Sequence, residues 1–598
     1  MNEASEKFMA RYFTSFTYFY KRLGYRIFIA MFLNICVGVL DGFGLAMFLP
    51  LLQMVGDNSV DKGGLGNLNF LWDGMESLGW SPTLFSILMM MTVFFILKGL
   101  AQYIKGIYGV VLKQFFIKKM RINLSNALAK MSYKSFVMAN AGRIQNTMTG
   151  EVMRMSKAYL GYFGAFQQTV MVVVYMVFAI LIDAKFAILI CIGGGLTNFI
   201  YNRIYKLTKI SSRKLTKGLN FYQGLILQFV HNFKYLKATG YLKEYNKKLK
   251  KSIEKIEKHN KKIGKLGSLV TAIREPVLII VVSVVILIQV NFLDGSIGTI
   301  LLSLLFFYRA LSALIQLQTY YNEFLAVSGS MDNMTAFEQE LEKSIEPEGN
   351  LKIERFEHQI ALNNIGFGYA EELIIKNINL EIKKNETVAI VGESGSGKTT
   401  LVNIITALMP VKEGQVLIDG VDSMYLNRES FQRRIGYITQ DPVIFTDTVF
   451  NNISFWSEPT PENLKRFWWA IQQASIDDYI RELPKREHTI LGNNGVNLSG
   501  GQKQRISIAR ELFKDVDILV LDEATSALDS ETEEAIQKSI EELKGKYTII
   551  LVSHRLSTIK NADRIIVMNN GEIVNEGSFS ELVLNSSKFK KMVELQEL

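Results

Sequence analysis

The sequence predicts an α-helical domain that spans a membrane six times, followed by an α/β domain of the P-loop type. Three observations support this prediction. Long apolar stretches recur between residues 27 and 317, short aliphatic segments alternate with charged segments from about residue 351 onward, and residues 392–399 read GESGSGKT. The first pattern is typical of membrane-spanning helices, and the second is typical of a soluble α/β domain.

The composition agrees with an uneven distribution of apolar residues. The chain has 598 residues, of which 48% are hydrophobic, and its mean hydropathy is +0.15. These values are too apolar for a typical soluble chain and too polar for a chain that lies entirely in a membrane. Cys36 and Cys191 are the two cysteines and lie in apolar stretches, so neither a disulfide framework nor a metal site is predicted.

Six segments are long and apolar enough to form a spanning helix, which needs roughly 20 residues. They cover residues 27–50, 84–112, 162–182, 186–205, 268–292 and 297–317. The connector after the second segment has about 50 residues and the connector after the fourth has about 60. Because these connectors follow alternate spans, both lie on the same side of the membrane.

The charge of the second long connector sets the orientation. It begins with the basic residues Lys206, Lys209, Arg213, Lys214, Lys217, Lys234, Lys237, Lys243, Lys247 and Lys248. Only Glu244, Glu254 and Glu257 oppose them, so the positive-inside rule places this connector and both termini in the cytoplasm. We expect a multi-pass protein of the cytoplasmic (inner) membrane. Basic clusters also bind nucleic acid, but lipid head groups and solvent account for charges that flank spans, so we expect no nucleic-acid partner.

Residues 1–26 mix aromatic side chains with Arg11, Lys21, Arg22 and Arg26. They lack the apolar core and cleavage site of a signal peptide, so we expect an interfacial helix along the inner leaflet. The alternative is that these residues form no stable helix and only lead into the first span. The predicted division is an interfacial segment at 1–26, a transmembrane domain at 27–327, a linker at 328–350 and a P-loop domain at 351–598.

The glycine-rich loop predicts a nucleotide-phosphate site. Residues 387–391 read TVAIV, which is a strand pattern, and KTT at 398–400 opens a helix, as a P-loop requires. We expect Lys398 to reach the β- and γ-phosphates of ATP and Thr399 to bind Mg²⁺. The predicted ATP-binding residues of this loop are Gly392, Glu393, Ser394, Gly395, Ser396, Gly397, Lys398, Thr399 and Thr400.

Two further strand ends carry residues suited to hydrolysis. The aliphatic segment 518–521 ends in Asp522 and Glu523, one carboxylate to hold the metal through its water shell and one to orient the attacking water. Segment 549–552 is followed by Ser553 and His554, which places an imidazole at the same edge of an open α/β sheet. A second phosphate-binding motif is predicted at residues 498–505, LSGGQKQR, where a serine and two glycines precede a predicted helix. The backbone N–H groups and the helix dipole at such a helix start favour an anion.

The ordered motifs GESGSGKT, YITQD, LSGGQ, ILVLDE, SALD and SHR resemble those of the nucleotide-binding domain of ABC transporters. The six spans with long inner connectors resemble the exporter type, and the likeness covers essentially the whole chain. It implies ATP hydrolysis coupled to transport. The roles that it implies are adenine stacking by Tyr369, metal binding by Thr399, Gln440 and Asp522, catalysis by Glu523 as general base with Gln440, and a γ-phosphate contact from His554. A packing role is the alternative for Tyr369, since Phe367 is a neighbouring aromatic.

The resemblance also explains why the chain has two phosphate-binding motifs, GESGSGKT and LSGGQ. In this family the signature, here Ser499, Gly500, Gly501 and Gln502, closes over the ATP of a second copy, so that two chains form two composite sites with two-fold symmetry. Asp529 would communicate across that dimer. Because the chain carries a full set of site residues, we expect a homodimer, although a different partner chain stays open.

By the same resemblance, segments 133–143 and 233–241 are expected to hold short coupling helices. Ordinary amphipathic helices are the alternative. Exporters usually have a glutamate and an arginine just before LSGGQ, whereas this chain has Asn493 and Asn494. A charged coupling contact is therefore not expected at that point, although the neutral amides can still form hydrogen bonds.

Charges inside a membrane are costly, so they pair, face water or contact substrate. Lys98, Arg274 and Arg309 are basic residues of this kind. One hypothesis is a cationic cavity for an anionic lipid head group. The other is that Glu275 neutralises Arg274, that Asp41 or Glu323 pairs with another of these residues, and that the remainder extends to the membrane surface. A looser resemblance of FLPLLQ, TAIREP and FFYRAL to bacterial flippases of polyprenyl-pyrophosphate-linked oligosaccharides favours a lipid or lipid-linked anionic glycan. A drug or peptide exporter with a more apolar cavity is the alternative.

Overall fold

The computed structural model describes residues 14–48, 50–51, 77, 79, 83–182, 184–292, 297–346, 348–369, 372–492, 495–523, 530–553 and 555–597, and within the helices some side chains fall outside this description. The chain forms two compact units. The first comprises residues 1–131 and 139–345, and the second comprises residues 132–138 and 346–598. The short segment 132–138 therefore belongs with the C-terminal unit although the chain around it belongs to the first.

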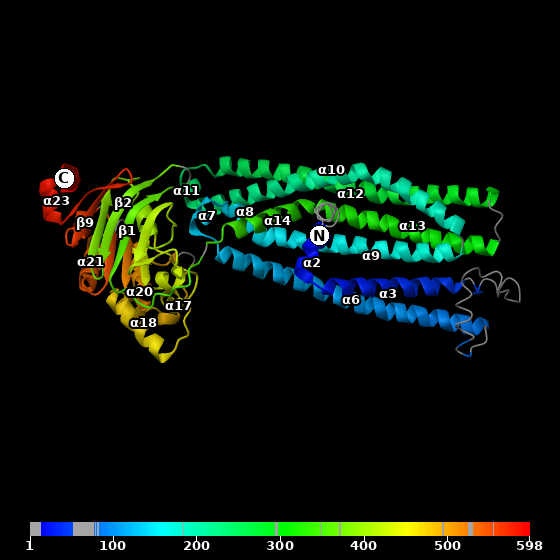
Figure 1. Ribbon diagram of the computed structural model, residues 1–598, viewed down its shortest axis with the longest axis horizontal. Coiled ribbons are helices and arrows are strands. Elements are labelled where there is room, and N and C mark those ends of the chain that lie inside the picture. The colour runs from blue at the N-terminus through cyan, green and yellow to red at the C-terminus, as the bar shows by residue number, and fades with distance from the viewer. Residues whose placement is uncertain are drawn as a thin grey trace. The chain divides into compact units, whose positions relative to one another are not determined.

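The first unit is a bundle of long helices that run side by side (Figure 1). Its long helices are α3 (Arg26–Ala46), α6 (Leu84–Ala129), α9 (Val152–Ile182), α10 (Ala184–His231), α12 (Leu242–Phe292) and α13 (Ile297–Ala326). Each predicted span falls on one of them, and the first continues past the end of α3. Among the described residues, three segments have the length and hydropathy to cross a membrane, namely Arg26–Ala46, Leu84–Ala129 and Ala141–Leu181.

Shorter helical elements complete this unit: α2 (Thr14–Leu23), α8 (Ala141–Asn146), the π-helical turn η2 (Thr147–Glu151), α11 (Phe233–Ala238) and α14 (Ser328–Lys343). Helix α2 lies within the segment predicted to be interfacial. Its Phe19 is buried and packs against Phe116 and Tyr159, whereas Tyr20 is 42% exposed. One buried and one exposed aromatic face suit a helix that lies at a membrane surface.

The segment predicted as a linker, 328–350, is helical over Ser328–Lys343. Met331, Met334, Phe337 and Leu341 are buried along it. Because their spacings are three or four residues, they form one apolar face, which α14 packs into the bundle. The polar composition of this stretch concealed an amphipathic helix.

The second unit contains two sheets. The antiparallel sheet has the order β2 (Ile375–Lys383), β1 (Gln359–Phe367), β4 (Glu413–Ile418) and β5 (Val421–Asp422). The second sheet has the order β10 (Glu572–Gly577), β9 (Arg564–Asn569), β3 (Thr387–Gly392), β8 (Thr548–Val552), β7 (Ile518–Asp522) and β6 (Ile435–Ile438). This architecture confirms the predicted α/β class.

Strands β9, β3, β8, β7 and β6 pair in parallel. Every residue of β3 and β8 is buried, as expected for strands covered on both faces. Because parallel strands end at the same edge of a sheet, the loops after β3, β6, β7 and β8 meet there. That edge therefore collects the predicted catalytic segments.

Helices, several of which lie beside the sheets in Figure 1, complete the described part of the second unit. They are α7 (Tyr133–Met138), α15 (Lys398–Ile405), α16 (Arg428–Arg433), α17 (Val449–Ser454), α18 (Pro461–Gln473), α19 (Asp477–Glu482), the 3₁₀ turn η3 (Arg486–His488), α20 (Gly500–Phe513), α21 (Ser530–Leu543), α22 (Leu556–Ile559), α23 (Phe579–Asn585) and α24 (Ser587–Glu597).

Candidate functional site

The P-loop joins β3 to α15, as the sequence predicts. Gly397 is the N-cap of α15 and has a φ of +100°, a left-handed conformation that favours glycine. At Gly392, an added Cβ would lie 2.4 Å from the carbonyl oxygen of Met568. The backbone therefore requires glycine at both positions, and the first turn of α15 begins with its N–H groups directed at the loop.

Lys398 lies inside the loop that it is predicted to serve. Its Nζ donates hydrogen bonds to the carbonyl oxygens of Gly392 and Glu393, both at 3.0 Å. Burial lowers the pKa of Lys398, and the carboxylates of Glu523 and Asp522 oppose this change. The Lys398 ammonium group can give up these hydrogen bonds to neutral carbonyl oxygens and bind phosphate oxygens in their place. Phosphate oxygens are stronger acceptors because they are charged.

Ser396 provides a second feature that fits a bound phosphate. Its Oγ is buried and has no hydrogen-bond partner among the residues that the structure describes. Buried hydroxyl groups are normally paired, so this oxygen suits a ligand that completes its bonding. The Thr399 side chain is exposed on the first turn of α15, where a hydroxyl can reach a metal ion.

Asp522 ends β7 and contacts a tyrosine that the sequence analysis did not single out. The Oη of Tyr437, on β6, donates to Oδ2 of Asp522 at 3.3 Å. Burial raises the pKa of Asp522, the Tyr437 hydrogen bond lowers it, Glu523 raises it and Lys398 lowers it, in decreasing order of effect. Because β6 and β7 are distant in sequence, only their parallel pairing brings these two residues together.

Glu523 meets Gln440 at the same edge. The Nε2 of Gln440 donates to Oε2 of Glu523 at 2.8 Å. Glu523 itself has a φ of +49°, and its backbone N–H donates to the carbonyl oxygen of Val552 at 2.8 Å. A non-glycine residue held in the left-handed region is strained, and such residues cluster at functional sites. The predicted general base and its predicted partner are thus in direct contact.

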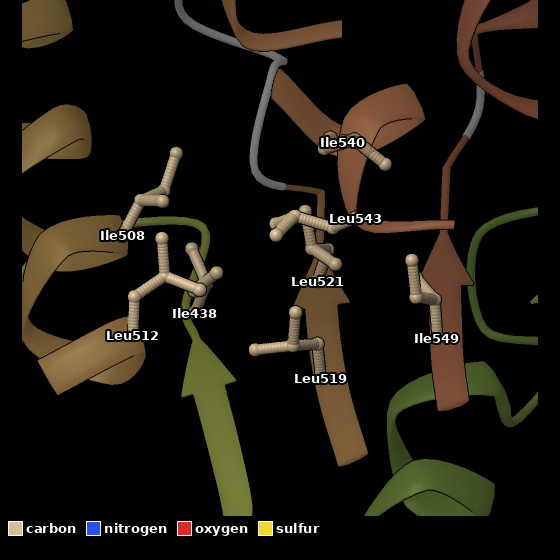
Figure 2. Close-up of a pocket in the computed structure, with 8 residues that line it drawn as sticks. All are labelled: Ile438, Ile508, Leu512, Leu519, Leu521, Ile540, Leu543 and Ile549. Atoms are coloured by element: carbon tan, nitrogen blue, oxygen red, sulfur yellow. The ribbon is translucent and has the colours of Figure 1, made fainter. Parts of the chain in front are cut away.

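An apolar cluster holds β7 in place (Figure 2). It consists of Ile438 from β6, Leu519 and Leu521 from β7, Ile549 from β8, Ile508 and Leu512 from α20, and Ile540 and Leu543 from α21. The helix that begins with LSGGQ therefore contributes to the same apolar cluster as the strand that ends in Asp522. Both motifs are thus attached to one close-packed core.

The LSGGQ motif opens a helix, as predicted. Ser499 caps α20: its Oγ accepts from the N–H of Gln502 at 3.2 Å, while its own N–H donates to Oε1 of Gln502 at 2.9 Å. This capping box fixes the first turn, and Ser499 and Gly500 are exposed at the surface of the unit. The helix N-terminus is thus available to a ligand brought by another molecule.

Tyr369 and the first predicted coupling segment meet in one loop. The Tyr369 and Phe367 rings lie 5.3 Å apart, edge to face. From α7, Nζ of Lys134 donates to the carbonyl oxygen of Gly368 at 3.2 Å and lies 5.4 Å from the centroid of the Phe367 ring. A segment that follows the long helix α6 therefore touches the loop that carries the predicted adenine-stacking residue.

Several predicted residues lie outside the part of the chain that the structure describes. They are Asp529 with the rest of the SALD motif, His554, Asn493 and Asn494, and the side chain of Arg274. Their predicted roles stay predictions.

In the first unit, a cavity of about 220 Å³ is lined by residues of α3, α6, α9 and α13. Its charged side chains are Asp41, Lys98, Lys105 and Arg309, and Gln102, Gln167, Gln168 and Gln316 contribute amides. Lys98 and Arg309 were both predicted from sequence and do line one cavity. Lys105 and the four glutamines were missed because polar residues on separate helices show their common location only after folding.

Lys98 is neutralised by Asp41, which is 2% exposed. The Nζ of Lys98 donates to Oδ1 of Asp41 at 2.5 Å, and the Oη of Tyr175 donates to Oδ2. This cluster ties α6 and α9 to α3, as the hypothesis of internal pairing anticipates for Lys98. With that charge balanced, Arg309 and Lys105 give the cavity its net positive charge.

Two family models match the chain. Residues 27–315 match the model described as ABC transporter transmembrane region, and residues 375–526 match the model described as ABC transporter. The first match covers the helical bundle, and the second includes the P-loop, the signature and the acidic end of β7.

Curated relatives differ in how much of the chain they cover. An ATP-dependent lipid A-core flippase of Syntrophus aciditrophicus is 45% identical over 246 residues, which is 41% of each chain. A protein of the same name from Hahella chejuensis is 29% identical over 84% of this chain and 86% of its own length. The heterocyst differentiation ATP-binding protein HepA of a Nostoc species is 27% identical over 95% of this chain and 93% of its own.

One solved structure has the same fold over nearly the whole chain. It is a bacterial Atm1-family ABC exporter with ATP bound, with a TM-score of 0.78 and 20% sequence identity. The match covers 96% of this chain and 100% of that one.

Proposed function

Because the chain belongs to the ABC transporters and joins a transmembrane region to one nucleotide-binding domain, we propose that it is an ATP-driven exporter that works by alternating access. One observation carries the proposal. The P-loop lysine, the Asp522–Tyr437 pair and the Glu523–Gln440 pair collect at one edge of a parallel sheet, in a chain whose other half is a bundle of membrane-length helices.

The residues at this edge suit hydrolysis of a nucleoside triphosphate. Lys398 and the first turn of α15 would bind the β- and γ-phosphates, and Ser396 Oγ would gain a partner. Thr399, Asp522 and Gln440 supply the oxygen ligands that Mg²⁺ prefers, and the ion would neutralise charge on the phosphates. Glu523 would take a proton from the attacking water, held in position by the amide of Gln440.

We further propose that two copies act together. The capped start of α20 lies at the surface of the second unit and offers N–H groups to an anion, while the P-loop of the same chain has its own phosphate-binding helix. A two-fold dimer would place each LSGGQ motif against the nucleotide of the other copy. Nucleotide would then stabilise the closed dimer, and hydrolysis would remove that stabilisation.

Coupling to the membrane helices would run through α7. Lys134 holds the loop of Gly368 and Tyr369, so closure around adenine would move α7 and the end of α6 that precedes it. The predicted coupling segment at 233–241 contains α11, in the first unit. Both segments lie at cytoplasmic ends of long helices if the basic connector is cytoplasmic, which also places both chain termini there.

The substrate that fits best is a lipid with an anionic head group. The cavity between α3, α6, α9 and α13 is polar, it has a net positive charge from Arg309 and Lys105, and its glutamine amides can bind hydroxyl groups. Relatives named lipid A-core flippase support a lipid. A drug or peptide exporter would be better served by an apolar cavity, so the polar lining favours the lipid or lipid-linked anionic glycan. The membrane would be the cytoplasmic one.

We predict that Arg309→Ala lowers translocation of an anionic lipid by at least roughly tenfold, because a charge-assisted contact to phosphate contributes about 1.5–3 kcal/mol. Basal ATP turnover should change much less, since Arg309 belongs to the first unit and the nucleotide site to the second. Both rates are measured in liposomes with a panel of anionic glycolipids, neutral lipids, drugs and peptides. Arg203→Ala, an exposed arginine outside the cavity, is the matched control. Equal translocation by the Arg309 variant would refute a cationic cavity.

We predict that Tyr437→Phe moves the acidic limb of the ATPase pH profile to higher pH. The lost hydroxyl lowers the pKa of Asp522, so its removal raises that pKa further. Asp522 must be ionised to hold the metal, and a carboxyl with a raised pKa loses its charge sooner as the pH falls. The profile of kcat/KM is measured for both proteins, with Tyr425→Phe, an exposed tyrosine of the same unit, as the control. An acidic limb that stays in place would show that Tyr437 does not act through Asp522.

A further inference from the structure

Helix α12 carries a regular row of lysines. Lys248, Lys251, Lys255, Lys258, Lys262 and Lys265 follow one another at alternating spacings of three and four residues, and all are exposed. At 3.6 residues per turn such spacings place side chains on one face of a helix. We call this row the lysine stripe.

The stripe runs beside the buried face of α12. Leu249 and Ile256, each one position after a lysine of the stripe, are 9% and 5% exposed. The buried face packs against α10, which lies alongside α12 in Figure 1. The stripe therefore follows the seam between the two helices on its solvent side.

The charge of the stripe is poorly balanced by its neighbours. Among the described residues, Arg213 of α10 forms an ion pair with Asp332 of α14, whereas no ion pair is formed by a lysine of the stripe. Glu257, on α12, instead accepts a hydrogen bond from Asn260 at 3.1 Å. A row of mutually repelling lysines that forms no ion pair with the described carboxylates is expected to attract an anion.

One half of the stripe gathers further positive charge. His259 lies at the seam, and its pKa is lowered first by burial and then by Lys214, Lys258 and Lys262. Since Lys214 belongs to α10, lysines from both helices converge on this point.

The same half lies nearest the membrane. The predicted span of α12 begins at residue 268, so at a rise of ~1.5 Å per residue Lys265, Lys262 and Lys258 lie about 5, 9 and 15 Å before it. Lys255, Lys251 and Lys248 lie about 20, 26 and 30 Å before it on the same estimate. With a Debye length of about 8 Å at physiological salt, the first group interacts with head groups much more strongly than the second.

We propose that Lys258, Lys262 and Lys265, together with Lys214, form a binding site for the phosphate group of acidic phospholipids in the cytoplasmic leaflet, and that occupation of this site stimulates the ATPase. Lysine binds phosphate as a mobile point charge, and several lysines close to a membrane surface recognise anionic lipid. Lipid bound there would contact both α10 and α12 and so stabilise their packing. These two helices connect the bilayer to the second predicted coupling segment, 233–241. The site is separate from the cavity proposed for the transported lipid.

The test compares two triple variants of equal charge on one helix. In the proximal variant, Lys258, Lys262 and Lys265 are replaced with glutamine, and in the distal variant Lys248, Lys251 and Lys255 are replaced. Full-length proteins are placed in nanodiscs of phosphatidylcholine with increasing phosphatidylglycerol, and the ATPase rate is recorded. We expect the proximal variant to need at least roughly tenfold more phosphatidylglycerol for half-maximal stimulation, and the distal variant to behave as wild type.

Three further arms make the result decisive. Lysine-to-arginine replacement at the three proximal positions should restore stimulation, which separates charge from folding. Inorganic phosphate added to phosphatidylcholine nanodiscs should not stimulate, because the bilayer positions the head group. ATP turnover in nanodiscs of pure phosphatidylcholine measures the nucleotide site without the acidic lipid. If the wild-type protein hydrolysed no ATP there or with phosphatidylglycerol, the result would contradict the proposed ATPase function and not the lipid site. Equal shifts in both triple variants, no shift in the proximal variant, or stimulation by inorganic phosphate would each overturn the lipid site.

Discussion

Replacing Glu523 with glutamine should lower ATP turnover by at least roughly 100-fold, because general base catalysis typically contributes 10²–10⁴ to the rate. Glutamine has the size of glutamate, and its carbonyl oxygen can still accept the hydrogen bond from Gln440. It cannot take a proton from water. The affinity for ATP should be retained, since Lys398 and the loop around it are unchanged.

The experiment measures the ATPase rate and the affinity for a fluorescent ATP analogue on the same purified samples. Glu429→Gln is the matched control because Glu429 is an exposed carboxylate that forms an i,i+4 ion pair with Arg433. Pairs of this kind contribute little, so the control should hydrolyse at the wild-type rate. Turnover close to wild type in the Glu523 variant would remove it from the role of general base.

Replacing Lys398 with methionine should weaken ATP binding by at least roughly tenfold, since a hydrogen bond to a charged group contributes about 1.5–3 kcal/mol. Methionine preserves much of the apolar stem but loses the ammonium group, so the contacts to phosphate and to the carbonyl oxygens of Gly392 and Glu393 are all removed. ATP turnover should fall with the affinity.

Nucleotide titration of the Lys398 variant should be accompanied by a thermal unfolding curve, which shows whether the loop still folds. Lys376→Met is the control, because Lys376 lies on β2 with an exposed side chain. If the Lys398 variant bound ATP as tightly as wild type while the control did likewise, the phosphate site would have to lie elsewhere.

The nucleotide-binding unit could be predicted in detail because its motifs are continuous in sequence. A glycine whose Cβ would strike Met568, and another held at a φ of +100°, are required by the local backbone, so GESGSGKT can be recognised without knowledge of the fold. Likewise Ser499 and Gln502 form a capping box within four consecutive residues.

Contacts between distant segments could not be predicted in this way. Tyr437 reaches Asp522 only because β6 pairs with β7, and Lys134 reaches Gly368 across more than two hundred residues. Sequence offered Asp41 as one of several partners for the buried lysines, whereas folding selects Lys98 and adds Tyr175. The pairings between membrane helices depend on helix rotation, which apolar composition alone does not fix.

The central claim is that each ATP is held between Lys398 of one copy and Ser499 of the other. The direct test co-expresses two differently tagged inactive chains, Lys398→Met and Ser499→Arg, and isolates the complex that carries both tags. In that complex one composite site has both residues intact, so we expect ATP turnover of up to about half the wild-type rate, although each parent alone is inactive. A mixed complex as inactive as its parents would show that each chain closes its own site, which would contradict the account.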